Sequence, residues 1–232
     1  MLLQTLREEV LDANLELVRR GLVLYTFGNV SGISRTDGLI VIKPSGVPYD
    51  EMRPEHLVLT DLVGKVVEGT LRPSSDLPTH LVLYEAMPDI GGVAHTHSDY
   101  ATAWAQARRP VTCFGTTHAD SFPGPVPVTD SLSDDEVAGE YEKNTGHAIV
   151  RALQDNKGAY SSGILVANHG PFTWGPDALA AAQNAAVLES IARMAYLTLA
   201  IDETAKPIGK GLHEKHFLRK HGVHAYYGQK RD

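Results

Sequence analysis

The amino-acid sequence predicts an α/β fold in which helices cover a layered sheet that is antiparallel in part. Stretches with apolar residues at helical spacing alternate with short runs rich in Val and Ile. Several of these runs follow one another too closely for crossover helices, so their strands must be antiparallel neighbours. The chain has 232 residues, 43% of them hydrophobic, and no linker-like segment. It therefore predicts one domain spanning residues 1–232.

Helices are expected wherever apolar residues recur at helical spacing. The first covers residues 2–20 and ends at Gly21. Four more are expected because their apolar cores are free of Gly-Pro breaks, and Pro176 and Asp177 mark the beginning of the last one. These four cover residues 79–87, 98–107, 143–154 and 178–200.

Strands are expected at six runs of four to eight residues that are bounded by Gly, Pro or Ser. They cover residues 39–43, 57–61, 65–69, 91–97, 110–115 and 163–170. The runs between residues 39 and 69 have short connections and predict the antiparallel part of the sheet.

Composition narrows the class of partner. The net charge of -7 argues against a broad surface for nucleic acid or an anionic membrane, so a small molecule is the expected partner. The single cysteine, Cys113, has no second cysteine for an internal disulfide. The N-terminal segment lacks a signal-peptide pattern, and no apolar run approaches the roughly 20 residues of a membrane span. We expect a cytoplasmic protein.

Two histidines near the end of an expected strand indicate a metal site. Residues i and i+2 of a strand point to the same face, about 6.5 to 7 Å apart at Cα, so His95 and His97 can close around one ion. His169 has a matching place at the end of another apolar run, followed by a glycine. Three neutral imidazoles with one open position are the ligand set of a catalytic zinc.

Several classes of metal-dependent protein carry a His-x-His pair, and other features of the chain indicate which class is expected here. A barrel amidohydrolase typically needs about 250 residues and carries the pair near its beginning, whereas this pair lies in mid-chain. Three turns of small residues could bind an anion, at residues 28–32, 43–46 and 72–76. Each alone is more often a plain turn, but together they suggest a phosphate site.

The ordered motifs GNVSG, IKPSGVPY, RPSSDLPTH, HTHS, THAD, NHGPF and HAYYGQ resemble those of the class II aldolase/adducin-head family, and in particular its sugar-phosphate epimerases. The resemblance runs from the first helix to the last few residues. It implies a three-layer α/β/α fold with a central mixed, largely antiparallel sheet. It also implies fourfold-symmetric tetramers whose sites lie between subunits, with the C-terminal tail contributing to a neighbour's site.

The resemblance also implies a role for each matching residue. One zinc ion per subunit would be bound by His95, His97 and His169, with Asp76 beside the metal. Asp120 and Tyr227 match the family's acid/base pair. The substrate phosphate would be held by Gly28, Asn29, Lys43, Ser45, Gly46, Ser74 and Ser75. His118, His216 and Arg219 are weaker candidates for the same pocket.

The implied activity is the interconversion of L-ribulose 5-phosphate and D-xylulose 5-phosphate in arabinose catabolism, by breaking and remaking the C3–C4 bond. No Gly-x-Gly-x-x-Gly follows a strand, so no nicotinamide cofactor is expected. Two alternatives stay open. One is a class II aldolase of the fuculose- or rhamnulose-phosphate type; in the fuculose-phosphate enzymes glutamate matches Asp76. The other is a non-catalytic, adducin-head-like interaction domain.

Overall fold

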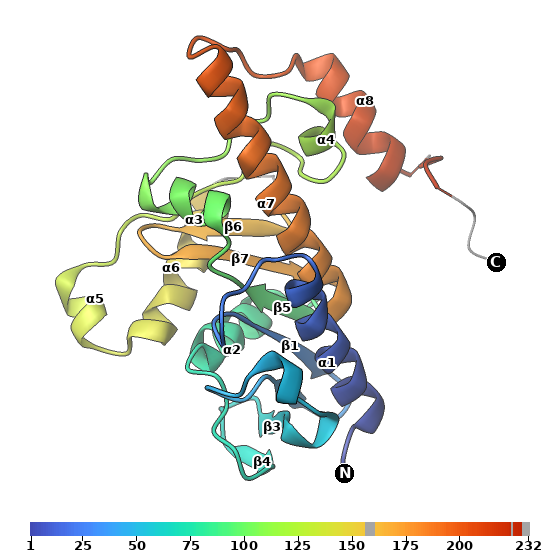
Figure 1. Cartoon of the computed structure of the whole chain (residues 1–232), viewed down its shortest axis with the longest axis vertical. Helices are drawn as coiled ribbons and strands as arrows, with labels where there is room; N and C mark the ends of the chain where they lie inside the picture. The colour runs from blue at the N-terminus through green and yellow to red at the C-terminus, as the bar shows by residue number, and fades with distance from the viewer. Residues whose placement is uncertain (156–160, 224, 229–232) are drawn as a thin grey trace.

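Seven strands form one sheet between two layers of helices, which confirms the predicted α/β fold (Figure 1). The computed structural model describes residues 1–155, 161–223 and 225–228. The strands lie in the order β4-β3-β2-β1-β5-β7-β6, and neighbouring strands are antiparallel. Among the described residues, parallel pairing is limited to an isolated bridge between Val128 and Leu165. The sheet is therefore more uniformly antiparallel than the mixed sheet that was expected.

Five of the expected strands are present and two further strands join them. The strands are β1 Asn29–Ser34, β2 Leu39–Ile42, β3 Val58–Asp61, β4 Val66–Glu68, β5 Gly92–His95, β6 Gly163–Val166 and β7 Gly170–Gly175. The expectation of a turn over residues 28–32 was wrong, because all but Gly28 lie in β1. A strand at residues 110–115 was also wrong: Val111 makes one isolated bridge to Val126, and the chain then turns into a helix at Thr116.

All five expected helices are present, with small shifts at their ends. The helices are α1 Gln4–Arg19, α2 Leu77–Ala86, α3 Asp99–Gln106, α4 Thr116–Ala119, α5 Asp134–Ala138, α6 Tyr141–Asp155, α7 Ala178–Ile201 and α8 Lys210–His221, with short 3₁₀ turns at Tyr49–Glu51 and Pro54–His56. Helices α4, α5 and α8 were not predicted. Helix α8 has no buried residue, so it lacks the apolar stripe by which a helix is recognised in a sequence.

The sheet is buried on both faces. Along β2, Val41 packs in a core with α1 and α7, while Ile40 and Ile42 pack in a second core with α2 and α6. A strand that is covered on both sides reads as an uninterrupted apolar run, which is why LIVI was recognisable in the sequence. Helices α4 and α8 lie side by side at the end of the molecule opposite β3 and β4 (Figure 1). Among the described residues, no helix combines the length and apolarity needed to span a membrane.

The close approach of α7 to β5 generates a stability prediction. A Cβ on Gly92 would lie 2.3 Å from the carbonyl oxygen of Asp177 and 2.5 Å from the Cα of Ala178. We expect Gly92→Ala to lower the free energy of unfolding by about 1–3 kcal/mol, because backbone atoms must move to admit the methyl group. Urea unfolding measures the change. The control is Gly115→Ala, where a Cβ meets no atom within 4 Å; equal stabilities of the two variants would contradict the prediction.

Candidate active site

The imidazoles of His95, His97 and His169 converge on one point. Each offers a ring nitrogen, and these nitrogens lie within 4.8 Å of one another. The Nε2 atoms of His95 and His97 are 3.0 Å apart. A tetrahedral zinc with bonds of about 2.0–2.1 Å holds neighbouring nitrogens roughly 3.3 Å apart, so little movement is needed to bind one ion. The expected grouping of these three residues is present, and its geometry fits a divalent metal.

Sheet register positions the first of these ligands. His95 ends β5, where it pairs with Asn29 of β1 on one side and Phe172 of β7 on the other. Its ring stacks on Phe172, with 4.1 Å between ring centroids. His97 follows two residues later, and the intervening Thr96 is buried. His169 lies in the tight turn between β6 and β7.

Burial keeps these histidines in the form that binds metal. It lowers the pKa of His95 to about 3, and it also lowers the pKa values of His97 and His169. The neutral His95 donates from Nδ1 to the carbonyl oxygen of Pro171 over 2.9 Å, which leaves the lone pair of Nε2 free. A metal ligand histidine needs this tautomer, so the site is prepared before any ion arrives.

The cluster opens into a cavity of about 390 Å³, in the size range of small-molecule sites. Every residue predicted for the metal or for the phosphate lines it: Gly28, Asn29, Lys43, Ser45, Gly46, Ser74, Ser75, Asp76, His95, His97 and His169. Five further lining residues were not predicted, namely Thr26, Phe27, Pro44, Tyr141 and Glu142. The fold thus brings together segments that are far apart in the chain, while the individual roles of these residues stay predictions.

Two of the small-residue turns lie against each other in the cavity wall. The N–H of Ser45 donates to the carbonyl oxygen of Arg72 over 2.9 Å, and that of Ser74 donates to the carbonyl oxygen of Lys43 over 3.0 Å. Gly46 has a φ of 71°, a conformation that glycine adopts without strain. The second turn leads directly into α2, whose N-terminal end carries the positive end of the helix dipole and so favours an anion. These features suit a phosphate group.

Lys43 is a buried cation in this wall. Its side chain is only 2% exposed, and its Nζ donates to the carbonyl oxygen of Thr26 over 3.0 Å. Among the described residues, no carboxylate lies within 4 Å of that nitrogen. Burial lowers the pKa of Lys43 to about 8, against the opposing effect of Asp76, so the amine is still mostly charged at neutral pH. A buried ammonium without an ion pair is a suitable partner for an anionic ligand.

Asp76 and Asn29 form a pair beside the histidines. The amide of Asn29 donates to a carboxylate oxygen of Asp76 over 2.6 Å. Burial alone would raise the pKa of Asp76, but electrostatic interactions with the imidazoles of His95 and His80 and the hydrogen bond from Asn29 bring it below its ordinary value. Asn29 Oδ1 and the Nε2 atom of His80 are buried without a hydrogen-bond partner. Of these two residues, Asn29 lines the cavity, where a polar ligand can satisfy its free oxygen.

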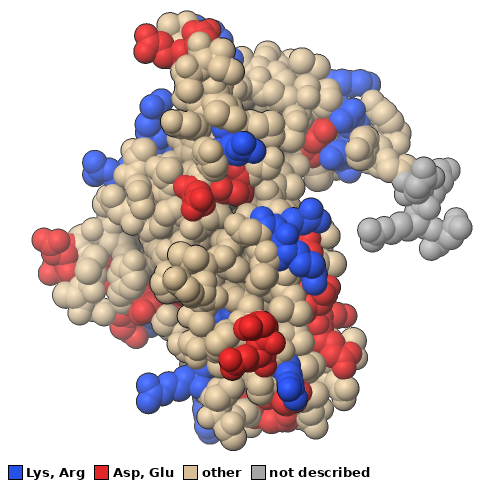
Figure 2. All heavy atoms as spheres, viewed as in Figure 1, with Lys and Arg blue, Asp and Glu red and all other residues tan. Residues whose placement is uncertain are grey.

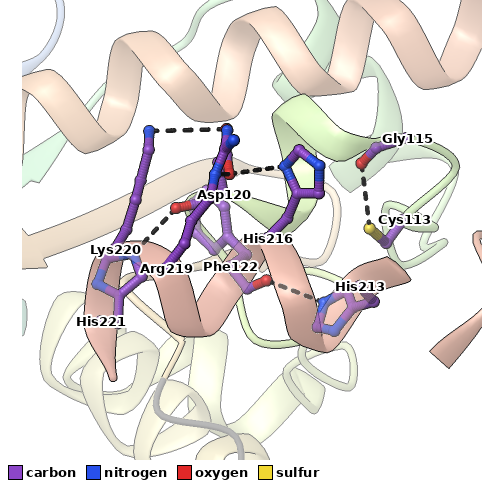
Figure 3. Close-up of polar contacts among 9 residues, drawn as sticks. All are labelled: Cys113, Gly115, Asp120, Phe122, His213, His216, Arg219, Lys220 and His221. Atoms are coloured by element: carbon purple, nitrogen blue, oxygen red, sulfur yellow. Dashed lines mark hydrogen bonds and ion pairs between the residues drawn. The ribbon is translucent and has the colours of Figure 1, made fainter. Parts of the chain in front are cut away.

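The predicted acid/base pair lies outside the cavity. Asp120 follows α4 and accepts hydrogen bonds from Arg219, over 2.7 and 3.0 Å, and from His216, over 3.0 Å (Figure 3). Burial raises the pKa of Asp120, but these two donors outweigh it and the net shift is downward. Tyr227 lies nearby, with its ring centroid 4.5 Å from Lys220 Nζ, and its N–H donates to the carbonyl oxygen of Arg219.

Helix α8 thus gathers the residues ranked as weaker candidates around Asp120. His216 and Arg219 contact its carboxylate directly. His118 instead lies buried within the same region and pairs through Nε2 with the carbonyl oxygen of Gly124 over 2.9 Å. Of the C-terminal motif HAYYGQ, residues 224 and 229 lie outside the described residues.

Figure 2 shows charges of both signs on one face of the molecule. On the face shown in Figure 2, Lys and Arg are interspersed with Asp and Glu. This face agrees with the expectation that the chain presents no broad basic surface.

Tyr141 and Glu142 were missed for a physical reason. They stand at the beginning of α6, which packs against α2. In the sequence they look like ordinary residues at the beginning of an amphipathic helix, and nothing marks them as part of a site. Only the packing of α6 on α2 turns them towards the histidines.

The chain is similar in sequence to a known protein family and to named members of it. The model of the Class II Aldolase and Adducin N-terminal domain family matches residues 8–196. The chain is 54% identical over 228 residues, covering 98% of its length and all of the relative, to the L-ribulose-5-phosphate 4-epimerase UlaF of Salmonella paratyphi B. The corresponding protein of Salmonella paratyphi C is 53% identical over the same span.

Solved structures give the same fold. An L-fuculose 1-phosphate aldolase is similar with a TM-score of 0.77 and 26% identity, over 91% of this chain and 94% of that one. YgbL of Klebsiella pneumoniae, described as a putative aldolase/epimerase/decarboxylase, is similar with a TM-score of 0.72 and 26% identity, over 91% and 97% of the two chains.

The convergence of the three histidines predicts the metal content of the protein. We expect about one divalent ion per chain in the purified protein and its loss in His97→Asn, because two remaining imidazoles hold an ion too weakly. Elemental analysis measures both. His147→Asn, on the exposed side of α6, is the matched control and should retain the ion. Full metal in the His97 variant would disprove the site.

Proposed function

The chain belongs to the class II aldolase and adducin N-terminal domain family, and we infer that it is an L-ribulose-5-phosphate 4-epimerase, an isomerase that interconverts L-ribulose 5-phosphate and D-xylulose 5-phosphate. The observation that carries this inference is the near-complete alignment, at 54% identity, with relatives that bear that name. The cavity supports it. Three histidines that could hold a metal ion and a buried lysine line the same cavity, and that cavity has the size of a small-molecule site.

The reaction must invert C4, which is not adjacent to the C2 carbonyl. Its C–H bond is therefore not acidic, and breaking and remaking the C3–C4 bond is the route that needs no oxidant. Cleavage leaves a three-carbon fragment, C1 to C3, that keeps the bonding electrons. The other fragment is glycolaldehyde phosphate, C4 and C5. Rotation of its aldehyde group presents the opposite face, and re-addition gives the epimer with no net loss of atoms.

We propose that one zinc ion per chain is held by His95, His97 and His169, with Asp76 beside it. When bound, the ion supplies a Lewis acid that polarises the substrate carbonyl and stabilises the negative charge left on the three-carbon fragment. The chain's own contribution is a set of three imidazoles whose pKa values are lowered, so that they are neutral and able to bind the ion; His95 is the buried member of the set.

Phosphate binding explains how an epimerase retains its aldehyde. In L-ribulose 5-phosphate the phosphate belongs to the C4–C5 fragment, so a site formed by Lys43 and the two small-residue turns holds the aldehyde while it rotates. The other members of this proposed site are Gly28, Asn29, Ser45, Gly46, Ser74 and Ser75. An aldolase acting on a 1-phosphate holds the opposite fragment by its phosphate, and its aldehyde is free to leave.

Proton transfer at the C4 oxygen is assigned to Asp120 and Tyr227, which we propose a neighbouring copy supplies. In the two epimers this oxygen points in opposite directions, so two groups are needed. Asp120 is held ionised by Arg219 and His216 and suits the role of base. Neither residue lines the cavity of its own chain, although both contact Arg219.

Exposed apolar residues support assembly into an oligomer. The second half of α7 exposes Met194, Leu197 and Ile201, the last of them 87% exposed. Buried contacts between copies would remove this apolar surface from water. We propose a homotetramer that works in the cytoplasm, with arabinose catabolism as its pathway and with no nicotinamide, nucleic acid or membrane partner.

A sugar-phosphate aldolase is the second candidate, favoured by the structural similarity to an L-fuculose 1-phosphate aldolase. The higher identity to proteins named as epimerases, and Asp76 in place of the longer glutamate, favour the epimerase.

Subunit hybrids test whether the site is shared between copies. Asp120→Asn and Tyr227→Phe should each cut epimerisation on the order of 10²-fold or more while leaving the metal content intact. Co-expression of the Asp120 variant with His97→Asn should restore activity, because roughly a quarter of all sites in randomly mixed oligomers then combine an intact cavity with an intact aspartate. Hybrids with no more activity than their parents would rule out donation from a neighbour.

Product analysis separates the epimerase from the aldolase. L-ribulose 5-phosphate should be converted to D-xylulose 5-phosphate without added nicotinamide and with little free dihydroxyacetone or glycolaldehyde phosphate. In deuterated water, no deuterium should enter at C4, because its C–H bond is never broken. Nuclear magnetic resonance of the products measures both outcomes. Free fragments as the main products would make the chain an aldolase, and deuterium at C4 would exclude cleavage of the C3–C4 bond.

A further inference from the structure

His169 differs from the other two histidines in how the backbone supports it. His95 belongs to a central strand that pairs on both sides, and His97 follows it closely. His169 lies instead in a three-residue turn, next to Asn168, whose φ of 62° is in the left-handed region. A turn leaves more freedom to the ring than a strand does. The orientation of His169 therefore depends on what holds its side chain.

The second ring nitrogen of each histidine shows what that support is. His95 bonds through Nδ1 to the backbone carbonyl of Pro171. His169 bonds through Nδ1 to the hydroxyl of Tyr141, with 3.2 Å between the two atoms. The rings of Tyr141 and His169 also stack, with centroids 6.1 Å apart and planes inclined by 23°. Of these two supports, only the one from Tyr141 is a side chain.

Tyr141 is itself held in place by the packing of α6 on α2. The hydroxyl of Thr79 in α2 donates to the carbonyl oxygen of Glu142 over 2.5 Å. One turn further along α6, a Cβ on Gly146 would lie 2.7 Å from the Cβ of Val82, which shows how closely the two helices approach. The beginning of α6 is thus fixed against the helix that starts at Asp76. The Tyr141 hydroxyl has little freedom to leave His169.

We propose that Tyr141 is a positioning residue for the metal centre: its hydroxyl accepts the Nδ1 proton of His169 and so turns the lone pair of Nε2 towards the ion. This inference rests on the proposed function only in that His169 is taken as a metal ligand. Hydrogen bonds of this kind fix both the tautomer and the ring angle of a ligand histidine. The hydroxyl keeps its own proton, which it directs into the cavity that Tyr141 lines.

A purely substrate-binding role for Tyr141 makes a different prediction. If its hydroxyl met only the sugar, its loss would raise KM and leave the affinity for the ion unchanged. If it positions His169, its loss weakens metal binding in the absence of any substrate. The affinity of the resting protein for zinc separates the two roles.

The experiment compares the full-length wild-type protein with Tyr141→Phe, which keeps the ring and removes one oxygen. Competition with a chelator gives the zinc dissociation constant, and the visible spectrum of the cobalt-substituted protein reports the ligand geometry. We expect zinc to bind about 10- to 100-fold more weakly in the variant, with an altered cobalt spectrum. Excess zinc should restore most of kcat, because the ion's chemistry needs no atom of Tyr141.

Two further variants complete the test. Tyr100→Phe removes a tyrosine hydroxyl from a separate surface hollow beside Tyr196 and should leave the zinc affinity unchanged. In a His169→Asn background, Tyr141→Phe should cause no further loss of affinity, because its effect passes through His169. Unchanged affinity and spectrum in Tyr141→Phe would overturn the inference and leave the proposed function standing. A wild-type protein that binds no zinc would overturn the metal centre itself.

Discussion

The register of β5 between β1 and β7 is the constraint on which the site depends. It sets His95 opposite Asn29 on one side and Phe172 on the other. The ring of His95 therefore stacks on Phe172 while Asn29 reaches across to Asp76. A slip of one residue would turn His95 to the other face of the sheet, into the core formed with α1 and α7. Because both faces of β5 are buried, such a slip is strongly disfavoured. The register of the sheet therefore fixes the position of His95 at the end of β5.

Burial sets the charges of the cavity wall in a consistent way. It lowers the pKa of His95 to about 3, so this imidazole is neutral at physiological pH. Lys43, with its pKa lowered to about 8, stays mostly charged. The same desolvation thus gives one cavity a neutral ligand for a cation and a poorly solvated cation for an anion. A phosphorylated sugar that chelates a metal matches both groups.

Asp120 and Tyr227, which we propose as the proton-transfer groups, lie outside the cavity that the three histidines line. Asp120 is tied to α8 by Arg219 and His216 (Figure 3). Tyr227 follows α8, and its backbone N–H donates to the carbonyl oxygen of Arg219. This charged arrangement does not line the cavity of its own chain. It acquires a function if a second copy brings α8 to the mouth of the neighbouring site. Catalysis would then require assembly, and single chains would bind metal without turning over substrate.

The sequence by itself determined the fold class and the helices and strands with clear apolar periodicity, because periodicity reports the burial of each element separately. Ordered motifs such as HTHS and KPSG, through their family resemblance, predicted most of the residues that line the cavity, but not Thr26, Phe27, Pro44, Tyr141 and Glu142. The sequence did not reveal β1 and β7, whose Gly, Ser, Pro and Thr residues hide their periodicity, and it wrongly placed a strand at residues 110–115.

Tertiary structure alone decided the contacts that make the site. His95 meets Pro171 across 76 residues of chain, and Asn29 meets Asp76 across 47. Tyr141 approaches His169 because α6 packs on α2. Asp120 lies outside the cavity, at the place where α4 packs on α8. These placements depend on register and helix packing, which result from many weak contacts between distant segments. No local pattern in the sequence encodes such a sum, so the geometry of the site emerges only when the chain is folded.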